Sequence, residues 1–320
     1  MKKILIITSN RLGDCILSSG LNKYFKQKYS NCHLTFVCGT LPSELFKYCN
    51  FIDKLIVLNK KKYSLHWIYL WYKVFFTKWF YVIDLRGTGL SFFLLSKKRT
   101  IYRKSLNSEE HKVSELTRKV TGKILSPSFK IVDKINSRTE YLNEILKAKK
   151  NKKIIIVAPT ANWIGKIWPI ERYLELTNSL RKKKIFCNSI FIFVGPSEEK
   201  LGSEILLKKK RKYIYDLFGK PSVIEIFKIM EIADFFIGND SGLMHMAALA
   251  KTKTIGLFGP SNSKKYGPWG KGNLVVSSPK TPDQLMGFKG FNPKKCGSLM
   301  LDLKTDEVLK KILNYSRNNE

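Results

Sequence analysis

The sequence predicts two doubly wound α/β domains, each built on a parallel sheet with helices on both faces. Three observations support this prediction. The chain has 320 residues, about twice the length of an average domain. In each half, short β-branched apolar runs alternate with segments of helical period. A polar, lysine-rich stretch over residues 126–153 separates the halves, although length alone also allows one large domain.

The first half begins with an apolar strand at residues 4–8, a loop at 9–14 and a helix at 15–25. This unit of strand, loop and helix is then repeated, which is typical of a parallel sheet with helical crossovers. The remaining expected elements are strands at 33–38, 54–58 and 81–85, a helix near 43–49, and an aromatic helix within 65–80.

The second half repeats the alternation and ends in a helix at residues 306–315, for which Thr305 is the expected N-cap. Doubly wound domains bind ligands at the carboxyl ends of their strands, so we expect the ligand loops to face a cleft between the two domains. The expected elements are strands at 154–158, 189–194, 213–216, 235–237 and 254–258, and helices at 170–180 and around 199–208.

The net charge of +33 calls for an anionic partner, which could be nucleic acid, an acidic membrane surface, or a phosphorylated or carboxylated substrate. Ten of the 58 basic residues are arginine, and lysine, asparagine and isoleucine are abundant together, so A+T-rich codon usage accounts for a large part of the charge. The basic runs are scattered and no nucleic-acid-binding motif is visible. We therefore do not expect a nucleic-acid partner.

Cysteine usage and hydropathy predict a cytoplasmic protein. The six cysteines show no zinc-type spacing, and several lie inside apolar runs, as small core residues do. The first apolar run is too short for a signal peptide. The aromatic stretch at 65–80 is interrupted by His66, Lys73 and Lys78 and is shorter than the roughly 20 apolar residues that span a bilayer. It could lie on the inner face of the inner membrane as a peripheral contact.

Two loops combine residues that suit a phosphorylated ligand. Residues 239–245, NDSGLMH, follow an apolar strand and begin an Ala-rich helix, so free N–H groups, a hydroxyl and a glycine meet at a helix N-terminus. Residues 160–169, TANWIGKIWP, contain Lys166, which could neutralise a diphosphate leaving group. The alternatives are a capping role for Asp240 or Ser241, a His245 packed on the sheet, and a surface lysine.

The loop at 9–14 ends in Gly13 and Asp14, and two interpretations of Asp14 stay open. Its carboxylate could point toward a ligand, or it could be a helix N-cap, a position that aspartate favours. The motif G-x-G-x-x-G is absent after the first strand, which excludes a nicotinamide-dependent oxidoreductase of the Rossmann type. An Asp-x-Asp motif is also absent.

Taken together, these segments resemble glycosyltransferase family 9, the heptosyltransferases of lipopolysaccharide core synthesis, across nearly the whole chain. The resemblance implies a GT-B architecture, in which two Rossmann-like domains face a central cleft. Residues 1–150 would bind the acceptor and residues 151–320 the nucleotide-sugar donor. The segments that carry the resemblance are RLGD at 11–14, IDLRG at 83–87, KIWP at 166–169, NDSGLMH at 239–245 and LFGPS at 257–261.

The resemblance further implies an inverting, metal-independent transfer without a cofactor. The sugar, heptose from ADP-heptose, would pass to a lipopolysaccharide core or related anionic glycan acceptor. A basic nucleic-acid-binding protein and a catalytically inactive ligand-binding protein are the alternatives. The implied roles are general base for Asp14, diphosphate binding for Lys166, Asp240, Ser241, Gly242, Leu243 and His245, nucleotide binding for Thr160 and Glu198, and acceptor binding for Arg11 and Arg86.

Overall fold

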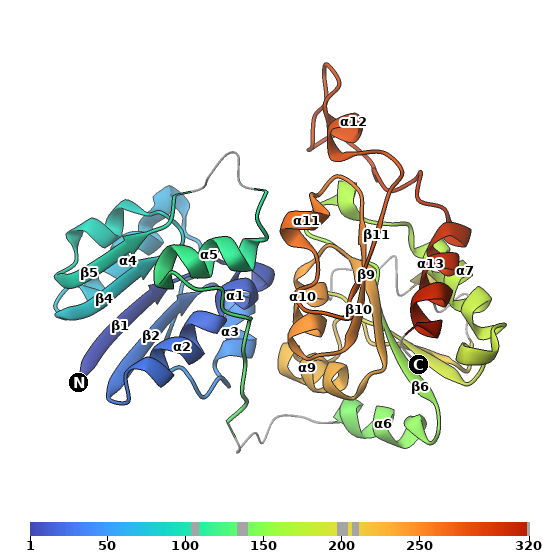
Figure 1. Ribbon diagram of the computed structural model, residues 1–320, viewed down its shortest axis with the longest axis horizontal. Coiled ribbons are helices and arrows are strands. Elements are labelled where there is room, and N and C mark those ends of the chain that lie inside the picture. The colour runs from blue at the N-terminus through green and yellow to red at the C-terminus, as the bar shows by residue number, and fades with distance from the viewer. Residues whose placement is uncertain (104–108, 133–139, 197–203, 207–210, 319–320) are drawn as a thin grey trace. The chain divides into compact units, whose positions relative to one another are not determined.

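The chain forms two compact units, Met1–Asn136 and Ser137–Glu320, each built on a parallel sheet (Figure 1). The structure is a computed structural model that describes residues 1–103, 109–132, 140–196, 204–206 and 211–318. Most of the helix expected around residues 199–208 lies outside these ranges. The alternation of strands and helices predicted from the sequence is present in both units.

The sheet of the first unit has the strand order β3-β2-β1-β4-β5, and all neighbouring strands run parallel. At the carboxyl edge of the sheet, Ile7 pairs with Val37 on one side and with Asp84 on the other. The loops that follow β1, β2 and β4 therefore begin at the same level. The strands are β1 (Lys2–Ile7), β2 (Cys32–Cys38), β3 (Lys54–Val57), β4 (Trp79–Asp84) and β5 (Ser96–Ile101).

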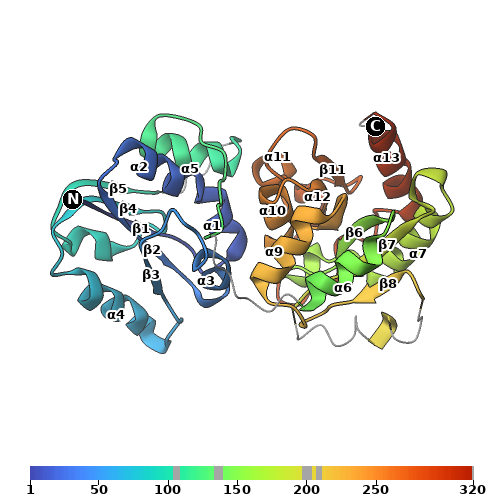
Figure 2. The same cartoon turned by 90° about the horizontal axis from the view of Figure 1, so that it is seen from below.

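Helices cover both faces of this sheet, with α4 on one face and α2 and α5 on the other (Figure 2). Beneath α4, Leu70 and Val74 pack with Leu5 and Ile7 of β1. On the opposite face, the rings of Phe25 and Tyr81 pack in a T-shaped contact with their centroids 5.6 Å apart. The helices are α1 (Leu12–Ser18), α2 (Gly20–Lys28), α3 (Thr40–Phe46), α4 (Leu65–Val74) and α5 (Lys112–Thr121), with short 3₁₀ helices η1 (Lys62–Ser64) and η2 (Gly89–Phe93).

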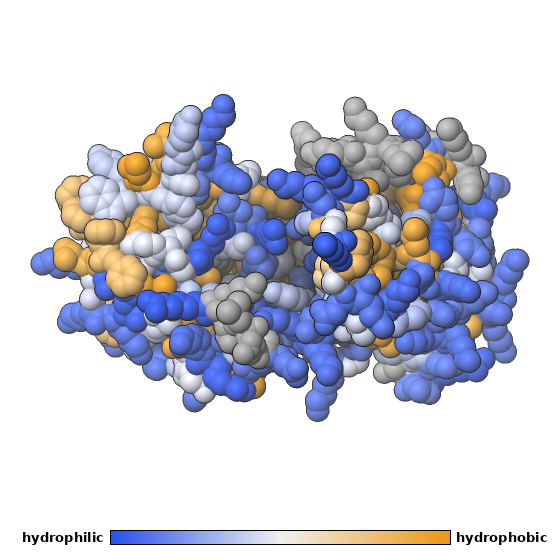
Figure 3. All heavy atoms as spheres, turned by 90° about the horizontal axis from the view of Figure 1, so that it is seen from above, coloured by the Kyte–Doolittle hydropathy of each residue, from blue (hydrophilic) through white to orange (hydrophobic). Residues whose placement is uncertain are grey.

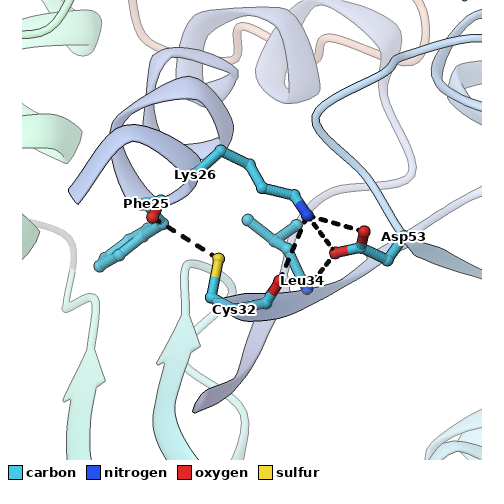
Figure 4. A network of polar contacts seen from close by, with 5 residues as sticks. All are labelled: Phe25, Lys26, Cys32, Leu34 and Asp53. Carbon is cyan, nitrogen blue, oxygen red and sulfur yellow. Dashed lines mark hydrogen bonds and ion pairs between the residues drawn. The ribbon is translucent and has the colours of Figure 1, made fainter. Parts of the chain in front are cut away.

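A polar network joins α2 to the amino ends of β2 and β3 (Figure 4). The ammonium group of Lys26 donates to both carboxylate oxygens of Asp53 at 2.7 and 2.6 Å, and to the carbonyl of Cys32 at 3.3 Å. Asp53 also accepts the backbone N–H of Leu34 at 2.6 Å. Asp53 directly precedes β3, and its carboxylate accepts from Lys26 of α2 and from Leu34 of β2. It therefore links one helix and two strands.

The helix predicted over residues 15–25 is broken in the structure, so that prediction was wrong in its continuity. Helix α1 ends at Ser18 and α2 begins at Gly20. The backbone at Ser126 passes so close to Gly20 that a Cβ there would lie 2.4 Å from the Ser126 carbonyl oxygen. Ser19 accepts the N–H of Ser128 through its hydroxyl. A returning segment distant in sequence thus fixes the break.

The sheet of the second unit has the strand order β11-β10-β9-β6-β7-β8, again parallel throughout. Asn239 at the end of β9 pairs with Leu257, and Gly238 pairs with Ala158, so the carboxyl ends of the central strands are aligned. The strands are β6 (Lys153–Ala158), β7 (Ser189–Phe193), β8 (Ile214–Asp216), β9 (Phe235–Asn239), β10 (Lys253–Phe258) and β11 (Leu274–Ser277).

Helices α7 and α13 cover one face of the second sheet, and α9 and α10 cover the other (Figure 1). Trp168, just before α7, and Tyr173 within it are fully buried core residues whose ring centroids lie 4.8 Å apart. The helices are α6 (Glu140–Lys149), α7 (Ile170–Arg181), α9 (Val223–Ile232), α10 (Gly242–Leu249), α11 (Ser263–Tyr266), α12 (Pro282–Met286) and α13 (Thr305–Arg317), with η3 (Ile164–Lys166) and η4 (Lys184–Phe186).

Helix α6 packs on α9 through a buried carboxylate. Glu225 of α9 is 1% exposed and accepts the backbone N–H groups of Tyr141 and Leu142 at 3.0 and 3.2 Å. These N–H groups lie in the first turn of α6, where no intrahelical acceptor exists. The carboxylate also meets the positive end of the helix dipole. The contact joins α6 to the second unit.

Two sheet-edge strands and one helix cap differ from the sequence prediction. Strand β5 was not predicted because its residues, SKKRTI, look like a solvated basic run, and β11 was not predicted either. Both are edge strands, which tolerate charge and irregular burial. The expected N-cap at Thr305 was wrong, because Thr305 is the first helical residue and its hydroxyl donates to Glu175 at 2.6 Å.

Candidate active site

The donor side of the candidate site begins where β9 ends. Asn239 is fully buried, and its side-chain oxygen accepts from the backbone N–H of Trp168 at 3.1 Å and from the hydroxyl of Tyr173 at 2.8 Å. These two bonds fasten the segment before α7 to the end of β9. They bring the predicted 160–169 and 239–245 segments together at one edge of the sheet.

Lys166 and Asp240 form an ion pair of 2.5 Å at this edge. The lysine side chain is 25% exposed and the aspartate side chain 8% exposed. His245 lies behind the pair, with Nε2 4.0 Å from the other Asp240 carboxylate oxygen. Lys166 is therefore a partly buried, oriented cation with one solvent-facing side, and the alternative of an unengaged surface lysine is wrong.

The helix that follows, α10, starts at Gly242 with Ser241 in the N-cap position. The Ser241 side chain makes no capping bond, so a capping role for it is wrong. Its hydroxyl is buried and has no hydrogen-bond partner within the described ranges. A buried hydroxyl of this kind beside the N–H groups of Gly242 and Leu243 suits a ligand oxygen.

Two further serine hydroxyls repeat this pattern on neighbouring strands. Ser261 follows β10 and Ser278 follows β11, and each has a buried hydroxyl for which the described residues supply no partner. The N–H of Ser278 donates to the Phe258 carbonyl at 2.7 Å, so the two strand ends are in contact. Ser278 escaped the sequence analysis because β11 itself was not predicted. Gly259 has a packing role, since a Cβ there would lie 2.3 Å from the sulfur of Met300.

Thr160 lies after β6 and is 6% exposed. Its methyl group lies 2.9 Å from where a Cβ on Gly195 would stand, so the loops after β6 and β7 are closely packed. Glu198, the second nucleotide-binding candidate, lies outside the described residues.

On the first unit, Asp14 is the third residue of α1 and is half-buried. The N-cap is Arg11, so the capping interpretation of Asp14 was wrong. The hydroxyl of Ser9 donates to one carboxylate oxygen of Asp14, Oδ2, at 2.9 Å. This bond does not involve the second carboxylate oxygen, Oδ1. Gly39, after β2, sits against the loop, because a Cβ there would lie 2.7 Å from the Cα of Asn10.

The second candidate loop of the first unit is organised by Asp84, a residue that the sequence analysis did not single out. Its buried carboxylate accepts the backbone N–H groups of Arg86, Gly87 and Thr88 and the hydroxyl of Thr88, at 2.6 to 3.0 Å. Gly87 has φ of +68°, a conformation that favours glycine. The carboxylate thus shapes the turn that presents Arg86.

Arg86 and Arg11 are both exposed, as acceptor-binding guanidinium groups would need to be. The guanidinium carbon of Arg86 lies 5.5 Å from the centre of the Trp67 ring in α4. The pKa of the neighbouring Cys15 thiol is raised to about 12, chiefly by burial and in part by the Asp14 charge, while a hydrogen bond with Thr8 and the Arg86 charge oppose the rise. The charges of Asp14 and Arg86 therefore both affect Cys15, which follows Asp14 in α1.

The described part of the chain holds no group of three or more His, Cys, Asp or Glu side chains placed to share a metal ion. Within the same ranges, no helix is both long enough and apolar enough to cross a bilayer.

Two α/β units, each built on a parallel sheet with its candidate ligand residues at the carboxyl edge, give the chain the GT-B architecture. Two solved structures share this fold over almost their whole length. They are the ADP-heptose lipopolysaccharide heptosyltransferase II of Escherichia coli (TM-score 0.74, 17% identity, 100% of this chain and 99% of that one) and a family 9 glycosyltransferase of Veillonella parvula (TM-score 0.77, 17% identity, 99% and 97%).

The chain belongs to glycosyltransferase family 9 (heptosyltransferase), whose sequence model matches residues 93–287. The lipooligosaccharide heptosyltransferase 2 of Campylobacter jejuni is 26% identical over 330 aligned positions, which cover 98% of this chain and 99% of the relative. The family and fold expected from the sequence are confirmed.

Proposed function

We propose that this glycosyltransferase transfers heptose from ADP-heptose to an anionic acceptor of the lipopolysaccharide or lipooligosaccharide core. The names of the E. coli and C. jejuni proteins above support the donor and the acceptor class. The observation that carries the proposal is the Lys166–Asp240 pair beside the unpartnered Ser241 hydroxyl at the start of α10. In this assignment the unit of residues 137–320 binds the donor, and the first unit binds the acceptor.

The second unit stabilises the leaving diphosphate. The N–H groups of Gly242 and Leu243 and the hydroxyl of Ser241 would donate to phosphate oxygens, and Lys166 would add a positive charge. Asp240, braced by His245, orients that lysine. Thr160 and Glu198 are our candidates for contact with the nucleoside. These groups form no covalent bond with the donor. In this proposal they balance the negative charge of the departing ADP without a metal ion.

Asp14 supplies the base. Its carboxylate would take the proton of the acceptor hydroxyl as that oxygen bonds to the anomeric carbon, while the bond from that carbon to the diphosphate breaks and ADP leaves with the electron pair. A single displacement of this kind inverts the anomeric configuration. General-base catalysis of this type contributes about 10² to 10⁴-fold. Arg11 and Arg86 would pair with anionic groups of the acceptor.

The test is calorimetric titration of ADP, GDP, UDP and dTDP in the presence of a chelator, followed by turnover of ADP-heptose. We expect selective ADP binding that is lost in Lys166→Ala and kept in Lys183→Ala, an exposed lysine of the same unit. Preference for another nucleotide would refute the proposed donor. Binding of none would refute the donor site, and a salt-sensitive DNA shift would then favour the nucleic-acid alternative.

We further propose that the enzyme works in the cytoplasm as a peripheral protein on the inner face of the inner membrane, in contact with acidic lipid. The positive charge of the chain supports this part of the proposal.

A further inference from the structure

The first unit exposes large apolar side chains that come from two neighbouring segments. Figure 3 shows apolar and aromatic side chains gathered on this unit, at the left of the view. Phe76 is 82% exposed and Phe93 69%. Exposed apolar groups that gather in this way mark interaction surfaces. We call the set the aromatic face, and it consists of Ile68, Tyr72, Phe76, Phe92, Phe93 and Leu95.

The aromatic face lies on one side of the first sheet. The inward residues of α4, Leu70 and Val74, pack in the same core cluster as Leu90 and Leu94, which lie in and directly after η2. The outward residues of both segments therefore point away from a shared core. Because α4 and η2 rest on that core together, their exposed side chains form one surface rather than two.

The charge around this face has one sign. Between residues 54 and 103 the sequence contains a single carboxylate, Asp84, and that carboxylate is buried in its own turn. The ammonium groups of Lys61 and Lys73 lie 6.0 and 5.5 Å from the ring of Tyr69, which belongs to α4, the helix that carries Ile68 and Tyr72 of the face. Arg99 donates to the carbonyl of Leu94 at 2.7 Å and lies 5.9 Å from the Phe92 ring.

The combination of exposed apolar side chains with positive charge indicates which kind of partner binds the aromatic face. Exposed aromatic and aliphatic side chains accompanied by lysine and arginine, in a segment whose one carboxylate is buried, match the boundary between acyl chains and anionic headgroups. A second copy of the chain would have to oppose the same positive rim across a two-fold axis, which repulsion disfavours.

We infer that the aromatic face inserts into the headgroup region of an anionic bilayer and so fixes how the enzyme lies on the membrane. This inference deepens the proposed function, since it rests on the peripheral contact proposed there and names its residues. Helix η2 begins directly after the turn that Asp84 shapes, and Arg86 lies over Trp67 of α4. Docking through this face therefore brings the Arg86 loop to the lipid surface, where a lipid-linked acceptor would be presented.

The experiment measures partition of the full-length protein onto sucrose-loaded vesicles, either phosphatidylcholine alone or phosphatidylcholine mixed with phosphatidylglycerol. The aromatic variant is Phe76→Ser, Phe92→Ser and Phe93→Ser. Its matched control, Leu146→Ser, Phe288→Ser and Leu301→Ser, removes exposed apolar groups from the second unit. The basic variant is Lys61→Gln and Lys73→Gln, and its control is Lys182→Gln and Lys183→Gln, two exposed lysines of the second unit.

We expect strong partition to the anionic vesicles and weak partition to phosphatidylcholine. The aromatic variant should lose at least about 100-fold in the partition coefficient. The basic variant should lose about fivefold per lysine on anionic vesicles only. Both controls should stay within about threefold of wild type, since the electrostatic effect is local to the docking face.

The inference is overturned if wild type does not bind anionic vesicles, if the aromatic variant binds like its control, or if light scattering shows that the aromatic variant dissociates a dimer instead. ADP titration of each variant separates this result from the proposed function. Intact ADP binding without vesicle binding refutes the docking face alone. Vesicle binding that follows the expected pattern without ADP binding refutes the donor assignment and supports the docking face.

Discussion

Replacing Lys166 by methionine should weaken ADP binding about 30- to 150-fold. Two unit charges about 4 Å apart attract by about 4 kcal/mol at the effective dielectric constant near a protein surface. Because Lys166 is 25% exposed, water screens part of this attraction, and we expect about 2 to 3 kcal/mol. The substitution keeps the length of the side chain, so the loss reports charge. It also leaves the Asp240 carboxylate beside the diphosphate without its partner.

The ion pair allows a double-mutant cycle that tests this reasoning. Asp240→Asn alone should change the ADP dissociation constant by no more than about threefold, because Lys166 keeps its charge. In the Lys166→Met background, Asp240→Asn should restore about tenfold by removing an unpaired anion. The assay is calorimetry at two salt concentrations, with thermal unfolding as the control for folding. Additive effects, or a Lys166→Met loss below about threefold, would refute the arrangement.

Three further predictions concern the base, a packing contact and a thiol. Asp14→Asn should lower turnover of ADP-heptose by about 10² to 10⁴-fold without changing ADP affinity in calorimetry, and full turnover would remove Asp14 from the mechanism. Glu225→Ala should lower the free energy of unfolding by about 2 to 3 kcal/mol in urea, because two N–H groups of α6 lose their acceptor, and an unchanged midpoint would contradict the contact. Burial raises the pKa of Cys15 to about 12, so above pH 9 the unfolded state loses a thiol proton that the folded state keeps. The free energy of unfolding should therefore fall by up to about 1.4 kcal/mol per pH unit from pH 9 toward 12, and by less in Cys15→Ala. At pH 8, iodoacetamide should modify the exposed Cys187 long before Cys15. Equal rates of modification would contradict the burial of Cys15.

The sequence was sufficient for every strand except β5 and β11, because buried parallel strands have strong local signals. The runs in β1, β6 and β9 are apolar and rich in β-branched or aromatic residues, and a polar loop follows each of them. The edge strands β5 and β11 lack that signal, since one face or both meet water. The break between α1 and α2 was also hidden, because it depends on a contact between Gly20 and the distant Ser126.

For the candidate site, residue types were easier to predict than their partners. The sequence places Lys166 and Asp240 in loops that follow adjacent strands, yet only the fold shows that they pair. Ser278 could not be found without the strand before it. Asp84 has a local signal, an aspartate before a turn containing glycine, but that signal does not show that its carboxylate accepts three backbone N–H groups.

The close packing of Gly39 against Asn10 ties the proposed base to a position that meets no substrate. Any side chain at residue 39 would need the space now occupied by the backbone of the loop that leads to Asp14. Sensitivity to substitution should therefore extend to residue 39, just after β2, through backbone clearance rather than chemical contact. A survey of inactivating variants would therefore include places where neighbouring loops touch, as well as groups that take part in the reaction.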